Sequence, residues 1–308
     1  MAGRVLVETE NGIETRLVDI DRDLFMIPNM AIHVNKKVNE GMALSMTVDM
    51  LPLVGDKEDA GKLEALLEEA AGGKILAHDL FLYNRQKATV WGMEEQYFSA
   101  VGLDDSECAW CCTQGFLQAK EAESIPVLCV FDNEEISSRT RQGAVSCILE
   151  DVLARICEAL ELDRHSMLSQ SFMVSADNAH AFHPSHPEVN DAKNTPMMNK
   201  GIAIKFHAMQ KYSTDGVSAA IFRKICAEAG VPVQTYHNRA DSMGGETLGY
   251  LSLTHVSVPS IDIGLPQLAM HSSYETAGVK DVGYLIDAME AYYSSSLECP
   301  VDGTYIVK

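Results

Sequence analysis

The chain has 308 residues, close to the upper limit for one hydrophobic core, so one large α/β domain or two unequal domains are expected. Its 24 Lys and Arg against 44 Asp and Glu give a net charge of −20. Because the sequence also contains no run of Lys and Arg, this charge argues against nucleic acid and anionic membranes as partners. It favours cationic ligands, above all metal ions. No signal peptide or membrane-spanning run is evident, so we expect a cytoplasmic protein.

The first part of the chain is typical of a small β-rich domain. Residues 1–54 contain short apolar runs, among them the alternating run 43–54, and Asn11-Gly12 is a strong hairpin signal. A helix is expected within 56–73, where leucines recur at helical spacing before two glycines. We therefore expect one domain over residues 1–76 and a second over 77–308.

The second part alternates strands with longer helices, which predicts α/β layering. The apolar run 125–132 is typical of a buried central strand. The long loop 181–201 is expected to be functional. Further strands are expected at 171–177, 201–207 and 258–264, and helices at 141–162, 215–229 and 279–295.

The eight cysteines favour free thiols over disulfides in a cytoplasmic setting. Cys108 and Cys111 form a Cys-x-x-Cys pair, but no second pair follows at the spacing of a structural zinc site. Several others lie in apolar contexts and are expected to be buried: Cys129, Cys147, Cys157 and Cys226.

Acidic residues follow several expected strands, at the edge where α/β sheets bind ligands. They are Asp104-Asp105, Asp132 to Glu135, and Asp177. Glu134 and Glu135 are costly to bury together unless a cation lies beside them, and such a pair can divide metal binding and general-base work. The alternative is a solvated acidic turn or the start of a helix. The residues alone leave both open.

Histidines also lie at the expected sheet edge. His271 follows a strand and precedes Glu275, and it is either a metal ligand or a packed histidine. Prolines interrupt the histidine-bearing loop, so its histidines cannot share one helix face, and a substrate-contacting loop is favoured over a three-histidine metal site. These histidines are His180, His183 and His186.

Five ordered motifs then carry a family resemblance over nearly the whole chain. They are GLDD (102–105), FDNEEISS (131–138), SADNAHAFHP (175–184), IAIKFHAMQKY (202–212) and IGLPQLAMHS (263–272). The series resembles the M18 family of zinc aminopeptidases, which includes the aspartyl aminopeptidases. The resemblance implies a mixed-sheet zinc-exopeptidase domain with helices on both faces. It also implies a smaller β-rich dimerisation domain, residues 1–76, through which subunits form a dimer or larger cage.

The resemblance further implies two zinc ions per subunit, which Co²⁺ or Mn²⁺ can replace. Asp104 would bridge the two ions, Glu135 and His271 would bind one of them, and Asp177 the other. Glu134 would be the general base that takes a proton from the attacking water.

Residues that contact a peptide substrate are implied in the same way. His180 and His183 would line the pocket, Lys205 and Tyr212 would contact the substrate, and His33 would reach the active site of a neighbouring subunit. Lys205 offers a cation to an N-terminal Asp or Glu side chain, although a surface lysine at a strand end is the alternative. The expected activity is removal of N-terminal, acidic residues from peptides.

One departure from the family weakens this expectation. Its members carry a His-x-Asp motif whose histidine binds zinc, and none of the ten histidines here stands in such a motif. A truncated or catalytically silent scaffold that assembles through its β domain is therefore an alternative. A dinuclear aminopeptidase of different specificity is another, since Ser137, Gly244 to Glu246, and Ser273-Tyr274 also depart from the family.

Overall fold

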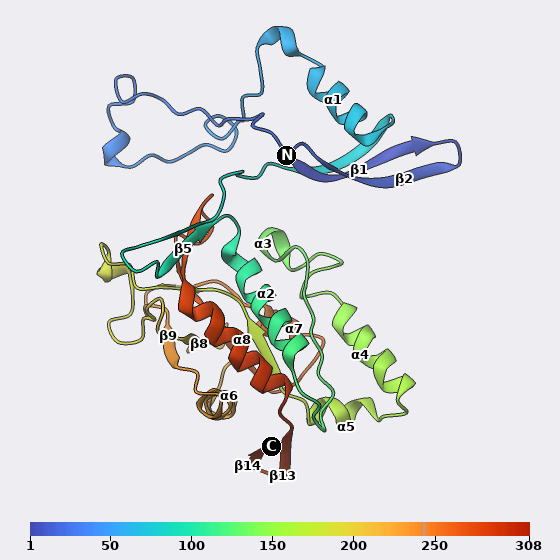
Figure 1. Cartoon of the computed structure of the whole chain (residues 1–308), viewed down its shortest axis with the longest axis vertical. Coiled ribbons are helices and arrows are strands. Elements are labelled where there is room, and N and C mark those ends of the chain that lie inside the picture. The colour runs from blue at the N-terminus through green and yellow to red at the C-terminus, as the bar shows by residue number, and fades with distance from the viewer. Residues whose placement is uncertain (243) are drawn as a thin grey trace. The chain divides into compact units, whose positions relative to one another are not determined.

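The computed structural model describes residues 1–242 and 244–308 and divides into two units, Met1–Gln86 and Lys87–Lys308 (Figure 1). The division falls after Gln86, not after residue 76 as expected. The reason is β3 (Ile75–Phe81), which pairs with β1 (Ala2–Thr9) and so belongs to the first unit.

The first unit is built on a sheet of order β2-β1-β3. β1 and β2 (Gly12–Asp19) form the hairpin that the Asn11-Gly12 signal predicted. The helix α1 (Lys62–Ala71) buries Leu67 against Val5, Val7 and Val18 of this sheet. It ends at Gly72, whose φ of 68° is a left-handed conformation that glycine adopts without strain. Two short 3₁₀ helices, η1 (Val38–Glu40) and η2 (Lys57–Asp59), complete the unit.

The expected strand at 43–54 is not formed. Among the described residues of this segment, pairing is limited to the bridge between Met26 and Leu53. Met46 and Val48 are exposed. The alternating pattern is that of a strand, but the segment pairs with neither edge strand of the sheet, β2 or β3, so its backbone stays irregular.

The second unit contains a mixed sheet of order β6-β10-β8-β9. β10 runs parallel to β6 and antiparallel to β8, and β8 runs parallel to β9. This confirms the mixed α/β class and the strands expected at 171–177, 201–207 and 258–264. They are β6 (Met173–Ala176), β8 (Ile202–Phe206) and β10 (Ser260–Gly264), and β9 (Val233–His237) is a further strand that was not expected.

One face of this sheet carries the main core. Ile204 and Ile263 are fully buried against three helices, of which α2 and α8 lie side by side (Figure 1). Because side chains alternate along a strand, Lys205 and Asp262 project from the opposite face. The three helices are α2 (Leu103–Gln118), α6 (Gly216–Glu228) and α8 (Val279–Tyr293).

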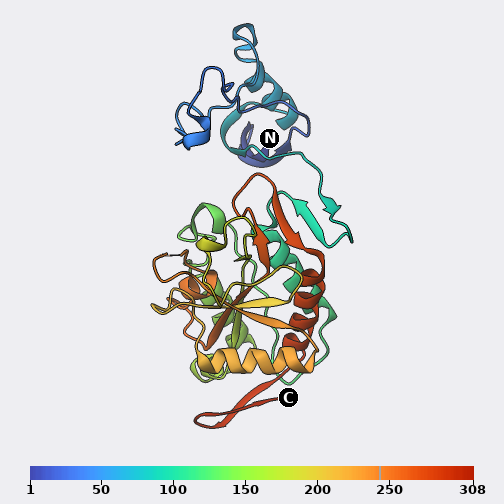
Figure 2. The ribbon, with the colours of Figure 1, turned by 90° about the vertical axis from the view of Figure 1, so that its left-hand side faces the viewer.

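A second sheet has the order β4-β5-β12-β11-β7, and a C-terminal hairpin, β13-β14, projects from this unit (Figure 2). The bounds of these strands are β4 (Thr89–Trp91), β5 (Tyr97–Ala100), β7 (Ala179–His180), β11 (Pro266–Leu268), β12 (Glu275–Gly278), β13 (Leu297–Val301) and β14 (Thr304–Val307). The other helices are α3 (Glu134–Ser137), α4 (Ile148–Ala159), α5 (Arg164–Ser169), η3 (Pro187–Val189) and α7 (Leu248–Ser252).

The run 125–132 is not the buried central strand that its composition predicts. It lies outside the described strands, and Val130 is 61% exposed. Its residues and those of β6 line a cavity of about 970 Å³. An apolar run forms a buried strand only where it pairs with a neighbouring strand, and this run does not pair with β6, the edge strand that lines the same cavity.

The cysteine predictions hold in part. Cys157 and Cys226 are buried free thiols, but Cys129 and Cys147 are exposed because neither lies in the strand or helix core that its apolar neighbours suggested. Over the described residues, no helix is long and apolar enough to cross a bilayer.

Candidate functional site

A cavity of about 320 Å³ collects most of the predicted site residues in the second unit. Its lining residues include some from the segment after β6, from β7, β8 and β9, and from the first turns of α2 and α3. Sequence-predicted residues that line it are Asp104, Glu134, Glu135, Asp177, His180, Lys205, Tyr212 and His271.

Asp104 and Asp105 stand in the first turn of α2, which begins at Leu103 after the N-cap residue Gly102, whose φ is 59°. The Asp104 side chain is only 4% exposed. One carboxylate oxygen of each residue is buried without a hydrogen-bond partner among the described residues. Burial, together with the charge of Asp177, raises the pKa of Asp104 to about 6 and that of Asp105 to about 10. Two buried oxygens without partners fit a bound cation.

Glu134 and Glu135 begin the short helix α3 and face the same cavity. Burial, followed by the charge of Asp104, raises the pKa of Glu135 to about 8. The pKa of Glu134 is raised as well, by burial and by Asp177. The pair thus starts a helix, as the acidic-turn interpretation expected. It also lies close to other acids, as the metal-site interpretation expected.

His271 lies between two acids of different elements. Its Nε2 is 3.2 Å from Oδ2 of Asp104 and 3.2 Å from Oε2 of Glu135. The buried carboxylate of Glu275 accepts the backbone N–H of His271 at 2.8 Å and that of Asp104 at 3.1 Å. Glu275 therefore fixes the two segments that carry these side chains.

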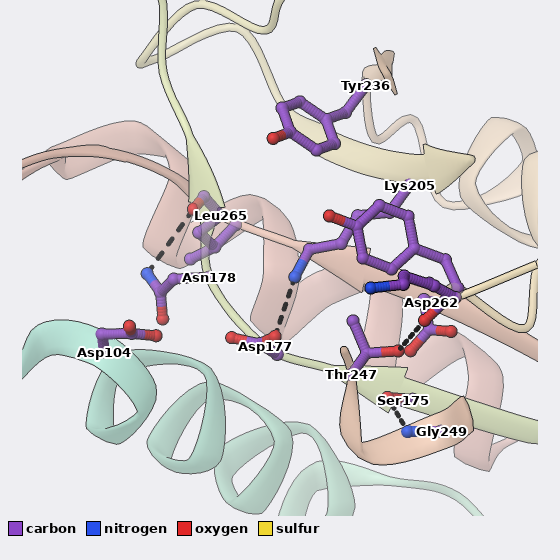
Figure 3. Close-up of polar contacts among 12 residues, drawn as sticks. Asp104, Ser175, Asp177, Asn178, Lys205, Tyr236, Thr247, Gly249, Asp262 and Leu265 are labelled. Carbon is purple, nitrogen blue, oxygen red and sulfur yellow. Dashed lines mark hydrogen bonds and ion pairs between the residues drawn. The ribbon is translucent and has the colours of Figure 1, made fainter. Parts of the chain in front are cut away.

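Lys205 reaches across the sheet to Asp177 (Figure 3). Its Nζ donates to Oδ2 of Asp177 at 2.9 Å, with side-chain exposures of 4% and 18%. Burial alone would raise the pKa of Asp177, but the Lys205 ammonium and nearby hydrogen bonds bring it below its usual range. Lys205 is buried, so the surface-lysine interpretation is wrong.

Three groups of side chains each bring one ligand atom per residue within 4.8 Å of the others. They are Asp104–Glu135–His271, Asp104–Asp105–Asp177 and Asp105–Glu134–Glu135. Asp104 belongs to the first two groups, which is what a residue shared by two ions requires. Carboxylate and imidazole are ordinary zinc ligands, and a dication would offset the mutual repulsion of these acids. The residues present fit zinc.

Of the substrate-contacting candidates, His180 and Tyr212 also line the cavity. Partial burial and then the charge of Lys205 lower the pKa of His180. The Tyr212 hydroxyl accepts a hydrogen bond from Nδ2 of Asn238 at 2.9 Å, and Nζ of Lys205 lies 5.8 Å from the Tyr212 ring centre.

Two predicted residues are not brought to this cavity by the structure. His183 is not among its lining residues; its ring packs against His186, with ring centres 5.1 Å apart. His33 is exposed in the first unit. The role of His33 in a neighbouring subunit therefore stays a prediction.

Sequence reasoning gave no role to Asp105 and Glu275. Asp105 carried a usable signal, since it forms an acidic pair with Asp104 at a strand end. Glu275 carried none beyond its proximity to His271, because only the folded chain brings its carboxylate to two separate backbone segments.

Comparison with known proteins gives one family. The family model described as Aminopeptidase I zinc metalloprotease (M18) matches residues 1–293. A protein of Clostridium novyi, "Probable M18 family aminopeptidase 2", is 42% identical over 306 residues, which are 96% of this chain and 71% of that protein.

Solved structures agree with this result. A structure of the Ape4 and Nbr1 complex superposes with a TM-score of 0.87 at 33% identity, covering 95% of this chain and 62% of that one. The S. cerevisiae mApe1 dodecamer superposes with a TM-score of 0.78 at 25% identity, covering 95% and 68%. The chain thus spans about two thirds of these structures.

Proposed function

Because this chain belongs to the M18 family of zinc aminopeptidases, we propose that it removes N-terminal residues, preferably Asp or Glu, from peptides. The observation that carries the proposal is the convergence of acids and one histidine on two adjoining ligand groups that share Asp104. Such paired groups suit two cations that together hold one substrate carbonyl.

In this proposal Asp104 would be shared by two zinc ions, Glu135 and His271 would hold one, and Asp177 would hold the other with Asp105 beside it. Co²⁺ or Mn²⁺ would serve in place of zinc. The bound zinc supplies a Lewis acid that polarises the scissile carbonyl and makes water more acidic. Glu134 takes the proton of the attacking water on its carboxylate, which lies in the same cavity as these ligands.

The preference for acidic residues rests on Lys205 in this proposal. Its ammonium is buried at the cavity, where its interaction with a carboxylate is strong, because little water competes for it. Once Asp177 serves a cation, Lys205 is the positive group available for the side chain of an N-terminal Asp or Glu. His180 and Tyr212 complete the walls that the substrate contacts.

Self-association through the first unit also belongs to the proposal. Residues 43–54 of that unit expose large apolar side chains, which suits contact with another subunit. The dodecamer reported for the yeast relative supports assembly of this chain. His33, in the same unit, would then contribute to a neighbouring subunit's site. The cytoplasmic location stays a prediction.

A catalytically silent scaffold is the second candidate. It is favoured by the ion pair between Asp177 and Lys205, which already occupies one expected ligand oxygen. The number of bound ions separates the candidates. Two zinc ions per chain that are retained after dialysis but lost in Asp104→Ala support the enzyme, and no such loss supports the scaffold.

The activity is tested with two peptides that are identical except for an N-terminal Asp or Asn. We expect the zinc-loaded chain to release Asp with a kcat/KM about tenfold or more above that for Asn, because only Asp carries the charge that Lys205 binds. Equal rates would contradict the acidic preference, and no release from either peptide would contradict the peptidase assignment.

A further inference from the structure

A second cluster of metal-binding side chains lies outside the candidate active site. Cys147 is the residue before α4, Glu150 stands in the first turn of α4, and His255 follows α7. One ligand atom from each lies within 4.8 Å of the other two. None of the three lines the 320 Å³ cavity among the described residues.

The spacing of these atoms matches the needs of a tetrahedral cation. Sγ of Cys147 is 3.8 Å from Nδ1 of His255, which is 3.6 Å from Oε2 of Glu150. Zinc bonds of about 2.3 Å to sulfur and about 2.0 to 2.2 Å to nitrogen and oxygen separate tetrahedral ligand atoms by roughly 3.3 to 3.6 Å. Shifts of a few tenths of an ångström would bring His255 to this separation from each of the other two residues, whose own ligand atoms lie within 4.8 Å of each other.

The same contacts argue against a nucleophilic cysteine with a histidine base. In such a relay the two imidazole nitrogens work separately, one facing the nucleophile and the other the orienting acid. Here Nδ1 of His255 faces both the Cys147 sulfur and the Glu150 carboxylate. The sulfur, nitrogen and oxygen atoms therefore point to one place, as the ligands of a metal ion do.

Arg164 orients the carboxylate of this cluster. Its NH2 donates to Oε1 of Glu150 at 2.6 Å, while Oε2 faces His255. Hydrogen bonds of this kind from outside a site commonly fix the direction of a metal ligand. The side chains of Glu150 and His255 are 29% and 31% exposed, which leaves a path for an ion and a fourth position for water.

We propose that Cys147, Glu150 and His255 bind one divalent cation of the zinc class, separate from the active-site ions. Thiolate and imidazole select such a cation over Mg²⁺ and Ca²⁺, which prefer oxygen. The bound ion joins α4 to the segment after α7, two parts of the chain that are 108 residues apart. It therefore stabilises this side of the second unit.

Cobalt titration of the whole chain tests the site, because a thiolate bound to Co²⁺ gives a sulfur-to-metal charge-transfer absorption in the near ultraviolet. Within the described residues, the ligand groups of the active site contain no cysteine, so that absorption reports the new site alone. We expect one Co²⁺ per chain to produce it. Cys147→Ser and His255→Ala should abolish it, whereas Cys129→Ser, which removes another exposed thiol, should preserve it.

A second measurement uses the unaltered chain and so does not depend on the folding of a variant. Zinc should slow alkylation of Cys147 by about tenfold or more, and leave alkylation of Cys129 unchanged. His271→Ala should keep both signals, which separates this proposal from the active-site proposal. Absence of the absorption, its survival in Cys147→Ser, or equal alkylation with and without zinc would each overturn the site.

Discussion

Nζ of Lys205 lies 2.9 Å from Oδ2 of Asp177, and both side chains are largely withdrawn from solvent. Breaking a buried ion pair leaves an uncompensated charge. In the metal-free chain, Lys205→Met should therefore lower the free energy of unfolding by about 3 kcal/mol. Urea denaturation measures the change, and Lys200→Met, at an exposed lysine, should change it by less than about 0.5 kcal/mol.

The double variant Lys205→Met with Asp177→Asn should be more stable than Lys205→Met alone, because it removes the charge left behind. If Lys205→Met changes stability no more than Lys200→Met does, the ion pair is not the buried contact described.

Glu275 fixes the backbone of two expected zinc ligands, Asp104 and His271. Glu275→Gln keeps the size of the side chain but replaces one accepting oxygen with a donor. We expect zinc affinity to fall by about 10- to 100-fold, as it does when groups that orient metal ligands are changed. Competition with a chromogenic chelator measures the affinity, and Glu94→Gln, at an exposed position, is the matched control. Unchanged affinity in Glu275→Gln would show that Glu275 does not position the ligands.

Gly264 ends β10 directly against the backbone of Asp177. A Cβ at Gly264 would lie 1.9 Å from the Asp177 carbonyl oxygen, so Gly264→Ala must displace β10 or the backbone of Asp177. We expect a loss of about 1 to 3 kcal/mol in unfolding free energy. Gly283→Ala, in α8 with nothing within 4 Å of the added carbon, should instead stabilise the chain by up to about 1 kcal/mol. Equal effects of the two substitutions would contradict this contact.

Asp281, which does not line the candidate site, should make the free energy of unfolding depend on pH. Burial raises its pKa to about 6, although the backbone N–H groups of Gly201 and Asn199 act in the opposite direction. The folded chain binds this proton more tightly than the unfolded chain does. The contribution of Asp281 to stability is therefore fully present below about pH 4 and is lost as the pH rises to about 6.

The test compares the parent with Asp281→Asn in urea from pH 4 to 6. The stability advantage of the parent over the variant should shrink by roughly 2 to 3 kcal/mol over that range. An advantage that grows with pH would mean that the pKa of Asp281 is lowered in the folded chain.

Much of the second unit could be predicted from the sequence, because its strands and helices have strong local patterns. The run 125–132 could not, since its composition does not reveal whether it will pair with a neighbouring strand, and it does not pair with the edge strand β6. The same holds for 43–54, whose alternation suggests pairing although the segment joins neither edge strand, β2 or β3. A strand depends on its neighbour in a way that an amphipathic helix does not.

The candidate site shows the same division. The acids could be predicted to meet, and Asp104, Glu135 and Asp177 do meet in one cavity. The reason differs from the expected one, because Asp104 follows β5 of the second sheet, Asp177 follows β6 of the first, and no strand directly precedes Glu135. The ion pair of Lys205 with Asp177 could not be predicted, because it joins residues 28 positions apart, one on β8 and one directly after β6, and only the fold reveals the order of these strands.

The most direct test of the proposed enzyme is peptide hydrolysis by Glu134→Gln with zinc at saturation. A glutamine in place of Glu134 cannot accept the proton, so kcat for release of an N-terminal Asp should fall by about 100- to 10,000-fold. Bound zinc, measured in the same sample, should stay at the parent's level. Full activity in Glu134→Gln, or no zinc-dependent release by the parent chain, would contradict the account.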